Sequence, residues 1–348
     1  YTFSYTLSLH DALPISSYEK YLSLEGETVV ISEQGTECAR IPLHNIESIV
    51  TMGYAGVSPA LLGKCAEYGI IISFLSRSGR FLAHTVGPYN GNVVLRKTQY
   101  RYSENEEICT SISKNIMMGK LFNSRGVIER AIRDYSASLD IEKLKSVSDD
   151  LKKSISNIEK CKDTEQLRGV EGEAASRYFS VFDDLILQQK KDFLFNTRVR
   201  RPPTDPVNAM LSFSYTLLNS MTTSALYCVG LDPYVGFMHK DRPGRTSLSL
   251  DLMEELRSVL ADRFVITMIN KRVINKDDFF VKENGAVYFT DEGKKKFLQS
   301  WQMKKQNTIV HPFLKEKVEW GMVPYVQALL LARFLRGDID GYPPFLWK

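Results

Sequence analysis

Short runs of apolar and alternating residues occupy the first 87 positions and predict β-strands. Residues 21–24 (Tyr-Leu-Ser-Leu) and 28–32 (Thr-Val-Val-Ile-Ser) flank a Glu-Gly-Glu turn, which is the pattern of a hairpin. Ser58 can cap a short helix that runs through Glu67 and ends at Gly69. Further strands are expected at 39–43, 46–50, 70–75 and 81–84. We therefore predict a small β-rich domain over residues 17–87.

The apolar spacing changes after a turn-forming cluster at residues 88–92 (Pro-Tyr-Asn-Gly-Asn), which we interpret as a linker. Asp205-Pro206 offers an acceptor at the N-cap and a proline in the first turn of a helix. Residues 279–289 contain Asn-Gly between two apolar runs and predict a hairpin. Helical spacing of about 3.6 residues covers 93–135, 141–160, 164–195, 205–229, 247–266 and 322–336. The fold class predicted is α+β, with the β-rich domain followed by a larger, mainly α-helical domain at 93–348.

Length and composition agree with two domains and narrow the class of protein. The chain has 348 residues, more than the ~250–300 at which a single core stops growing. Its 45 Lys and Arg against 41 Asp and Glu give a mild net charge of +4, so any nucleic-acid role must depend on local basic patches. No apolar run reaches the ~18–20 residues of a membrane helix. Five widely spaced cysteines without a Cys-x-x-Cys pair argue against disulfides or a cysteine zinc site and predict a cytoplasmic location.

The first 16 residues differ from the rest. Residues 5–15 (Tyr-Thr-Leu-Ser-Leu-His-Asp-Ala-Leu-Pro-Ile) resemble a translated sequencing-library adapter. A secretory signal would need a basic start, and no Lys or Arg precedes Lys20. We interpret residues 1–16 as a non-native leader, with a natural N-terminal segment as the alternative, and expect a native first strand to be missing. Without Asp11 the net charge becomes 45 − 40 = +5.

Two segments suggest a site for a hard cation, and the first is Gly-Val-Glu-Gly-Glu-Ala-Ala at 169–175. Glycine costs a helix about 1 kcal/mol, so close approach of another backbone or of DNA is a plausible reason for Gly169 and Gly172. Glu171 and Glu173 lie two positions apart, about 200° around a helix axis, so at most one faces a given site. The alternative is that both are solvated surface glutamates.

The second segment runs from Gly230 to Glu255. A histidine after an apolar run, such as His239, is more often structural than a ligand. Asp251 and Glu254, however, are spaced i, i+3 and share a helix face, while Glu255 is turned about 100° away. One imidazole nitrogen with several carboxylate oxygens suits Mg²⁺ or Mn²⁺ better than structural zinc.

Five motifs follow one another along the second half of the chain. They are Glu-Gly-Glu-Ala-Ala (171–175), Arg-Pro-Pro-x-Asp-Pro-Val-Asn-Ala (201–209), Gly-x-x-Pro-x-x-Gly-Phe-x-His (230–239), Arg-Pro-Gly-Arg-x-Ser-Leu (242–248) and Asp-Leu-Met-Glu (251–254). Together these motifs resemble the CRISPR-associated adaptation integrases, the universal spacer-acquisition endonucleases. The resemblance covers essentially all of residues 18–348, and the closing segment 340–348 resembles the subtype I-C branch.

The resemblance implies a catalytic helical domain with Glu171, His239 and Glu254 as metal ligands and Asp251 as a neighbour that orients or supplements the site. The cofactor is then Mg²⁺ or Mn²⁺, and the reaction joins 3′-OH ends of captured DNA to the CRISPR repeat by transesterification. If water attacks instead, the same site is a nuclease. The implied partners are duplex DNA with single-stranded 3′ ends, CRISPR repeat DNA, a second copy of the chain and a small ferredoxin-like companion protein.

We expect the homodimer to form through the β-rich domain. A half-covered sheet would leave Val29, Ile31, Ile70 and Ile72 in need of a partner surface. A monomer in solution would contradict this expectation.

Basic residues cluster in several places that suit DNA phosphates. An ordinary solvated surface is an equally good interpretation of each cluster taken alone. A branched-DNA repair metallonuclease and a non-catalytic DNA-binding scaffold are the alternative functions. The candidate DNA-binding residues are Lys190, Lys191, Arg198, Arg200, Arg201, Arg242 and Arg245, with further lysines at 294–296 and 304–305.

Overall fold

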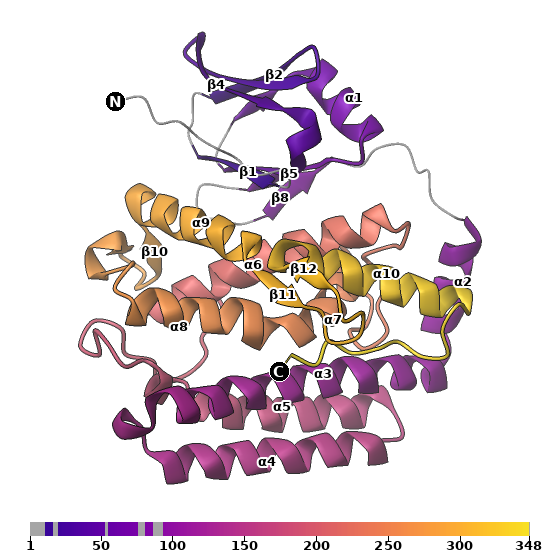
Figure 1. Ribbon diagram of the computed structural model, residues 1–348, viewed down its shortest axis with the longest axis vertical. Coiled ribbons are helices and arrows are strands. Elements are labelled where there is room, and N and C mark those ends of the chain that lie inside the picture. The colour runs from indigo at the N-terminus through magenta and orange to yellow at the C-terminus, as the bar shows by residue number, and fades with distance from the viewer. Residues whose placement is uncertain (1–10, 17–19, 53–54, 76–80, 86–92, 348) are drawn as a thin grey trace. The chain divides into compact units, whose positions relative to one another are not determined.

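The computed structural model describes residues 11–16, 20–52, 55–75, 81–85 and 93–347 (Figure 1). The chain divides into two compact units, residues 1–90 and 91–348. The predicted linker 88–92 and residues 1–10 lie outside the described residues. Strands come first and helices dominate the rest, so the predicted α+β class is confirmed.

Two four-stranded sheets form the N-terminal unit. The predicted hairpin is present as β2 and β3, and Ser58 caps α1 (Pro59–Glu67) by accepting a hydrogen bond from the Leu61 N–H at 3.2 Å. One sheet has the order β4-β3-β2-β6, from Thr36–Pro42, Thr28–Glu33, Lys20–Glu25 and Gly56–Val57. The other has the order β1-β5-β7-β8, from Asp11–Ser16, Ile46–Met52, Ile71–Leu75 and Phe81–His84.

Strand β1 falls inside the segment that we interpreted as a leader. Its backbone pairs in parallel with β5, from Asp11 opposite Ile46 to Ser16 opposite Met52. Residues 11–16 therefore form an edge strand of this sheet.

The core of the N-terminal unit corrects one expectation. Val29, Ile31, Ile70 and Ile72 are all buried within the unit, at 0–6% exposure. They pack in one cluster with residues of both sheets and of α1, including Leu22, Ile41, Ile49 and Leu61. These four side chains need no second subunit to cover them, so this reason for a homodimer was wrong.

The second unit is mainly helical, and α3 is its central element. Helix α3 packs against α4 and α5 on one side and against α7 on the other (Figure 1). Two short hairpins, β9–β10 (Phe279–Val281 and Val287–Phe289) and β11–β12 (Thr308–Val310 and Lys317–Glu319), join the later helices. The helices are α2 (Val93–Ser103), α3 (Glu106–Tyr135), α4 (Ile141–Lys160), α5 (Thr164–Ser180), α6 (Pro206–Cys228), α7 (Ser247–Leu256), α8 (Arg263–Asn270), α9 (Asp291–Gln306) and α10 (Val323–Arg336).

The structure corrects the predicted helical stretches 93–135, 164–195 and 247–266, and it contains one helix that was not predicted. The stretch 93–135 is two helices, because Asn105 ends the first run and caps α3 by accepting from the Ile108 N–H at 3.1 Å. The stretch 164–195 is helical only to Ser180, followed by a single 3₁₀ turn at Asp183–Leu185. Helix α9 was not predicted. Residues 247–270 are helical throughout, but 257–262 form a π-helical turn between α7 and α8.

The cysteines and the helix lengths of the described residues can be stated directly. All five cysteines are free thiols there, three of them buried. No helix in the described part of the chain is both long and apolar enough to span a membrane.

Candidate metal centre and DNA-binding pocket

Glu171 and Glu254, two of the three predicted metal ligands, meet at one lysine. Glu171 lies on α5, Glu254 on α7 and Lys120 on α3 between them. Lys120 Nζ donates to Glu171 Oε1 and lies 2.6 Å from Glu254 Oε2. Gly119 allows the close approach of α3 and α7, because a Cβ there would lie 2.9 Å from Glu255 Oε2.

Glu254 is buried and ionised. Its side chain is 6% exposed, and Oε1 accepts a hydrogen bond of 2.6 Å from Arg257 Nη1, three residues later at the start of the π-helical turn. Burial by itself would raise the pKa of Glu254. The positive charges of Arg257 and Lys120 outweigh burial and hold that pKa well below its usual range.

Asp251 holds His239 in one orientation. Asp251 is fully buried, and its Oδ2 accepts from the backbone N–H groups of Phe237 (2.7 Å) and Met238 (3.0 Å). Its Oδ1 lies 2.6 Å from His239 Nδ1 and accepts from the His239 backbone N–H at 3.0 Å. Glycine is needed at 236, because a Cβ there would lie 2.8 Å from Asp251 Oδ2. With Nδ1–H donating to Asp251, the free lone pair of the ring is on Nε2.

The two neighbouring glutamates point elsewhere. Glu173 is 65% exposed in its side chain and pairs with Arg177 at 2.9 Å. Glu255 is buried and accepts from Gln327 Nε2 at 2.9 Å, from the Phe345 N–H at 2.7 Å and from the Tyr342 hydroxyl. Burial raises the pKa of Glu255 to about 7, and these three donors oppose the rise. Glu255 therefore holds the C-terminal tail.

The carboxylates of Glu171 and Glu254 fit a hard cation, whereas no hydrogen bond or ion pair of the described residues joins His239 to either of them. Glu254 Oε2 is buried and forms an ion pair with Lys120 Nζ at 2.6 Å. The ammonium group of Lys120 thus lies between the two carboxylates, in the position that a metal ion bound by both would take. His239 makes no hydrogen bond or ion pair with either glutamate, and the described residues contain no group of three His, Cys, Asp or Glu arranged to hold a metal ion.

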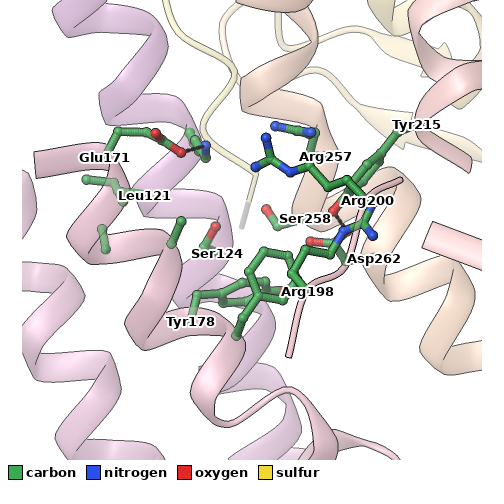
Figure 2. Close-up of a pocket in the computed structure, with 14 residues that line it drawn as sticks. Leu121, Ser124, Glu171, Tyr178, Arg198, Arg200, Tyr215, Arg257, Ser258 and Asp262 are labelled. Carbon is green, nitrogen blue, oxygen red and sulfur yellow. Dashed lines mark hydrogen bonds and ion pairs between the residues drawn. The ribbon is translucent and has the colours of Figure 1, made fainter. Parts of the chain in front are cut away.

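A cationic pocket opens beside Glu171 (Figure 2). Figure 2 shows Glu171 on one side of it and Arg200 on the other, with Arg257 and Ser258 between them. Arg257 Nε and Ser258 Oγ are buried and have no hydrogen-bond partner among the described residues. Its polar and charged lining residues are Lys120, Ser124, Glu171, Tyr178, Arg198, Arg200, Tyr215, Arg257, Ser258 and Asp262.

Arg198 is part of the pocket wall. Its guanidinium donates to Asn208 Oδ1 at 2.8 Å, to Ser212 Oγ at 3.1 Å and to the Val199 carbonyl at 2.6 Å. The same group lies 5.3 Å from the ring centre of Tyr215. Arg198 is therefore held in place from several sides.

The other candidate DNA-binding residues differ in whether an acidic side chain pairs with them. Lys190 pairs with Asp183 at 2.9 Å. Lys191, Arg200, Arg201 and Arg242 are exposed and Arg245 is half-buried, and no carboxylate of the described chain pairs with these five.

The basic clusters on α9 are largely used inside the fold. Lys294 and Lys305 are buried, and Lys296 pairs with Asp278 at 2.7 Å. Four aromatic residues near the basic clusters are also buried and closed to base stacking: Phe193, Phe195, Phe297 and Trp301.

Sequence reasoning missed Lys120 and Arg257. Arg257 lies three residues after Glu254, which is the spacing of an ion pair on a helix and could have indicated it. Lys120 lies on a different helix, 51 residues before Glu171, and no local pattern points to it. No other atom of the described chain would meet a Cβ at Gly169 or Gly172, so no other backbone approaches these glycines closely, and the close approach of DNA stays a prediction.

Comparison with known proteins gives one consistent family. Residues 13–303 match the family model described as "CRISPR associated protein Cas1". The chain is 46% identical over 338 residues to "CRISPR-associated endonuclease Cas1 1" of Chlorobaculum tepidum, a match that covers 97% of this chain and 98% of that protein.

Solved structures show the same fold. A casposase bound to integration product is similar with a TM-score of 0.82 at 22% identity, over 96% of this chain and 93% of that one. A chain of a Cas6-RT-Cas1–Cas2 complex is similar with a TM-score of 0.80 at 22% identity, over 100% of this chain and 37% of that one. At this level of identity the two likenesses concern the fold alone.

Proposed function

Since the chain belongs to the Cas1 family of CRISPR-associated proteins, we propose that it is a divalent-metal-dependent DNA integrase and endonuclease of spacer acquisition. In this role it joins the 3′-OH ends of captured DNA to the CRISPR repeat by transesterification, and it hydrolyses a phosphodiester when water attacks. The observation that carries the proposal is the meeting of Glu171 and Glu254, 254 − 171 = 83 residues apart, at Lys120 Nζ.

We assign Glu171, Glu254 and His239 as the ligands of one Mg²⁺ or Mn²⁺ ion. Carboxylate oxygens suit both ions, and the single imidazole favours the transition metal Mn²⁺ over Mg²⁺. When bound, such an ion polarises the scissile phosphodiester and lowers the pKa of the attacking hydroxyl. Asp251 fixes the ring of His239 so that Nε2 keeps its lone pair, and Arg257 keeps Glu254 ionised at neutral pH.

The cationic pocket gives the DNA strand a place beside the carboxylates. Arg200 is exposed and carries donors for phosphate oxygens, while Arg198 supports the wall of the pocket. Three exposed residues extend the positive charge: Lys191, Arg201 and Arg242. Contacts of this kind position a strand without reading its sequence.

The partners follow from the family and from the fold. A shared fold with a chain of a complex that also contains Cas2 supports a small companion protein, which we propose is ferredoxin-like. We further propose a homodimer that forms through the β-rich unit, and action on CRISPR repeat DNA in the cytoplasm. Light scattering tests the dimer, and a monomer at micromolar concentration would contradict it.

The decisive test compares two glutamates on one helix. Glu171→Gln removes a proposed ligand, and Glu173→Gln removes an exposed glutamate two positions away. With Mn²⁺ and branched DNA that carries a free 3′-OH, we expect Glu171→Gln to lose at least about 10²-fold in strand transfer and cleavage, equivalent to about 3 kcal/mol of transition-state stabilisation. Glu173→Gln should stay within about twofold, and both variants should bind DNA as the parent does. Equal activity of the two variants would exclude Glu171 as a metal ligand, whereas a parent protein without metal-dependent activity would favour a non-catalytic DNA-binding scaffold.

A further inference from the structure

Lys120 is a nearly buried cation of the helical unit that is held between two carboxylates. Its side chain is 11% exposed, and Nζ contacts Glu171 on α5 and Glu254 on α7 at the same time. These are two of the three residues to which we assign the divalent ion. The lysine therefore lies where that ion would have to bind.

The two cations cannot share these oxygens. A divalent ion binds carboxylate oxygens at about 2.0–2.6 Å, and Lys120 Nζ is already 2.6 Å from Glu254 Oε2. Two positive charges at such distances repel each other strongly in a partly buried site. Without any cation, however, the two carboxylates would repel each other. One positive charge is needed there in each state of the protein.

We propose that Lys120 is a built-in counter-cation that competes with the divalent ion for Glu171 and Glu254, an inference that rests on the proposed function. In the metal-free protein it holds α5 and α7 together through their carboxylates. When the ion binds, the ammonium leaves at least one carboxylate and turns towards the pocket that Lys120 itself lines. The long flexible stem of lysine permits this movement. There it faces the proposed position of a DNA phosphate.

Competition predicts an increase in metal affinity when the lysine is neutralised. Mn²⁺ is titrated calorimetrically into the full chain and into Lys120→Met, Lys120→Gln and Lys120→Arg. We expect the two neutral variants to bind Mn²⁺ about tenfold tighter or more, which corresponds to about 1.4 kcal/mol. Lys120→Arg keeps the charge and should stay within about threefold of the parent. Lys114→Met is the matched control on α3, since Lys114 donates to the Glu159 carbonyl at the surface.

The metal-free melting temperature provides a second readout. It should fall in the neutral variants, because Glu171 and Glu254 lose their shared cation, and Mn²⁺ should restore more of it than in the parent. If Lys120 had a merely structural role, the neutral variants would lose Mn²⁺ affinity together with stability. Unchanged or weaker Mn²⁺ binding by a folded neutral variant would overturn the proposal.

Two further measurements separate this proposal from the proposed function. If Glu171→Gln binds Mn²⁺ as the parent does, the ion binds elsewhere and the proposed metal centre fails. If Glu171→Gln loses Mn²⁺ while Lys120→Gln gains nothing, only the role of Lys120 fails. Should the neutral variants not fold, crystals of the parent with Mn²⁺ decide. We expect Lys120 Nζ more than about 3.5 Å from at least one carboxylate, beyond hydrogen-bond distance, and an ammonium that still bridges both would refute competition.

Discussion

Replacing Asn123 with alanine removes the main polar link between α3 and the C-terminal tail. Asn123 is fully buried on α3, one turn after Lys120. Its Nδ2 donates to the carbonyls of Glu255 and Phe345, both at 2.7 Å, and its Oδ1 accepts from the Trp347 N–H at 2.9 Å. Each bond contributes about 1 kcal/mol net, and a buried partner left unsatisfied costs about 1–3 kcal/mol. We expect a loss of about 3–5 kcal/mol in the free energy of unfolding.

Urea unfolding followed by circular dichroism measures this loss. For a unit of this size the expected fall in melting temperature is about 6–15 °C. The matched control is Asn157→Ala on α4, where an exposed side chain meets only Lys160 Nζ at 3.4 Å. That variant should change stability by no more than about 0.5 kcal/mol. A cost below about 1 kcal/mol for Asn123→Ala would show that the tail does not brace the helices that carry Lys120 and Glu254.

Two other predictions concern pH and DNA. Burial raises the pKa of Glu255 from 4.5 to about 7, so the folded state binds the carboxyl proton of Glu255 more tightly than the unfolded state does. The stabilisation that this proton gives the folded state is present at low pH and is lost as pH rises through 7. Relative to Glu255→Gln, the free energy of unfolding of the parent should fall by up to about 3 kcal/mol between pH 4.5 and 7.5, and a constant difference would contradict the assigned titration. Neutralising Arg200 and Arg201 should weaken DNA binding across sequences and flatten its salt dependence by roughly one unit of slope for each phosphate that the protein no longer neutralises, whereas an unchanged slope would exclude these residues from the DNA interface.

Features with signals inside a few residues were predicted correctly. Ser58 and Asp205 cap their helices through side-chain oxygens, which accept from the Leu61 and Asn208 N–H groups. The Asn-Gly pair closes the β9–β10 hairpin with Gly285 at φ +76°. Side-chain caps and turn residues act on their own backbone neighbours, so the sequence carries their whole physical cause.

Features that depend on distant partners were not predictable in this way. After the 3₁₀ turn that follows Ser180, backbone N–H groups bond to a distant side chain, since Asn270 Oδ1 accepts from the Leu187 and Gln188 N–H groups at 2.8 and 3.2 Å. Helix α9 did have a local signal, the cap at Thr290, which accepts from the Gly293 N–H at 3.1 Å. The residues of the candidate site likewise divide into those with a signal in the local sequence and those without one.

Glu171 and Glu254 stood out by motif, and Asp251 by its spacing to Glu254. Lys120 joins them only through the packing of α3 against α5 and α7. A contact of this kind has no expression in local spacing.

The most direct test of the metal centre is anomalous diffraction from crystals of the intact protein grown with Mn²⁺. We expect one anomalous peak between α5 and α7, within about 2.0–2.6 Å of carboxylate oxygens of both Glu171 and Glu254. His239 Nε2 should complete the ligand set, with Nδ1 still bound to Asp251. A peak at any other position, or none between these glutamates in protein that is active with Mn²⁺, would contradict the assignment of the catalytic ion to Glu171, His239 and Glu254.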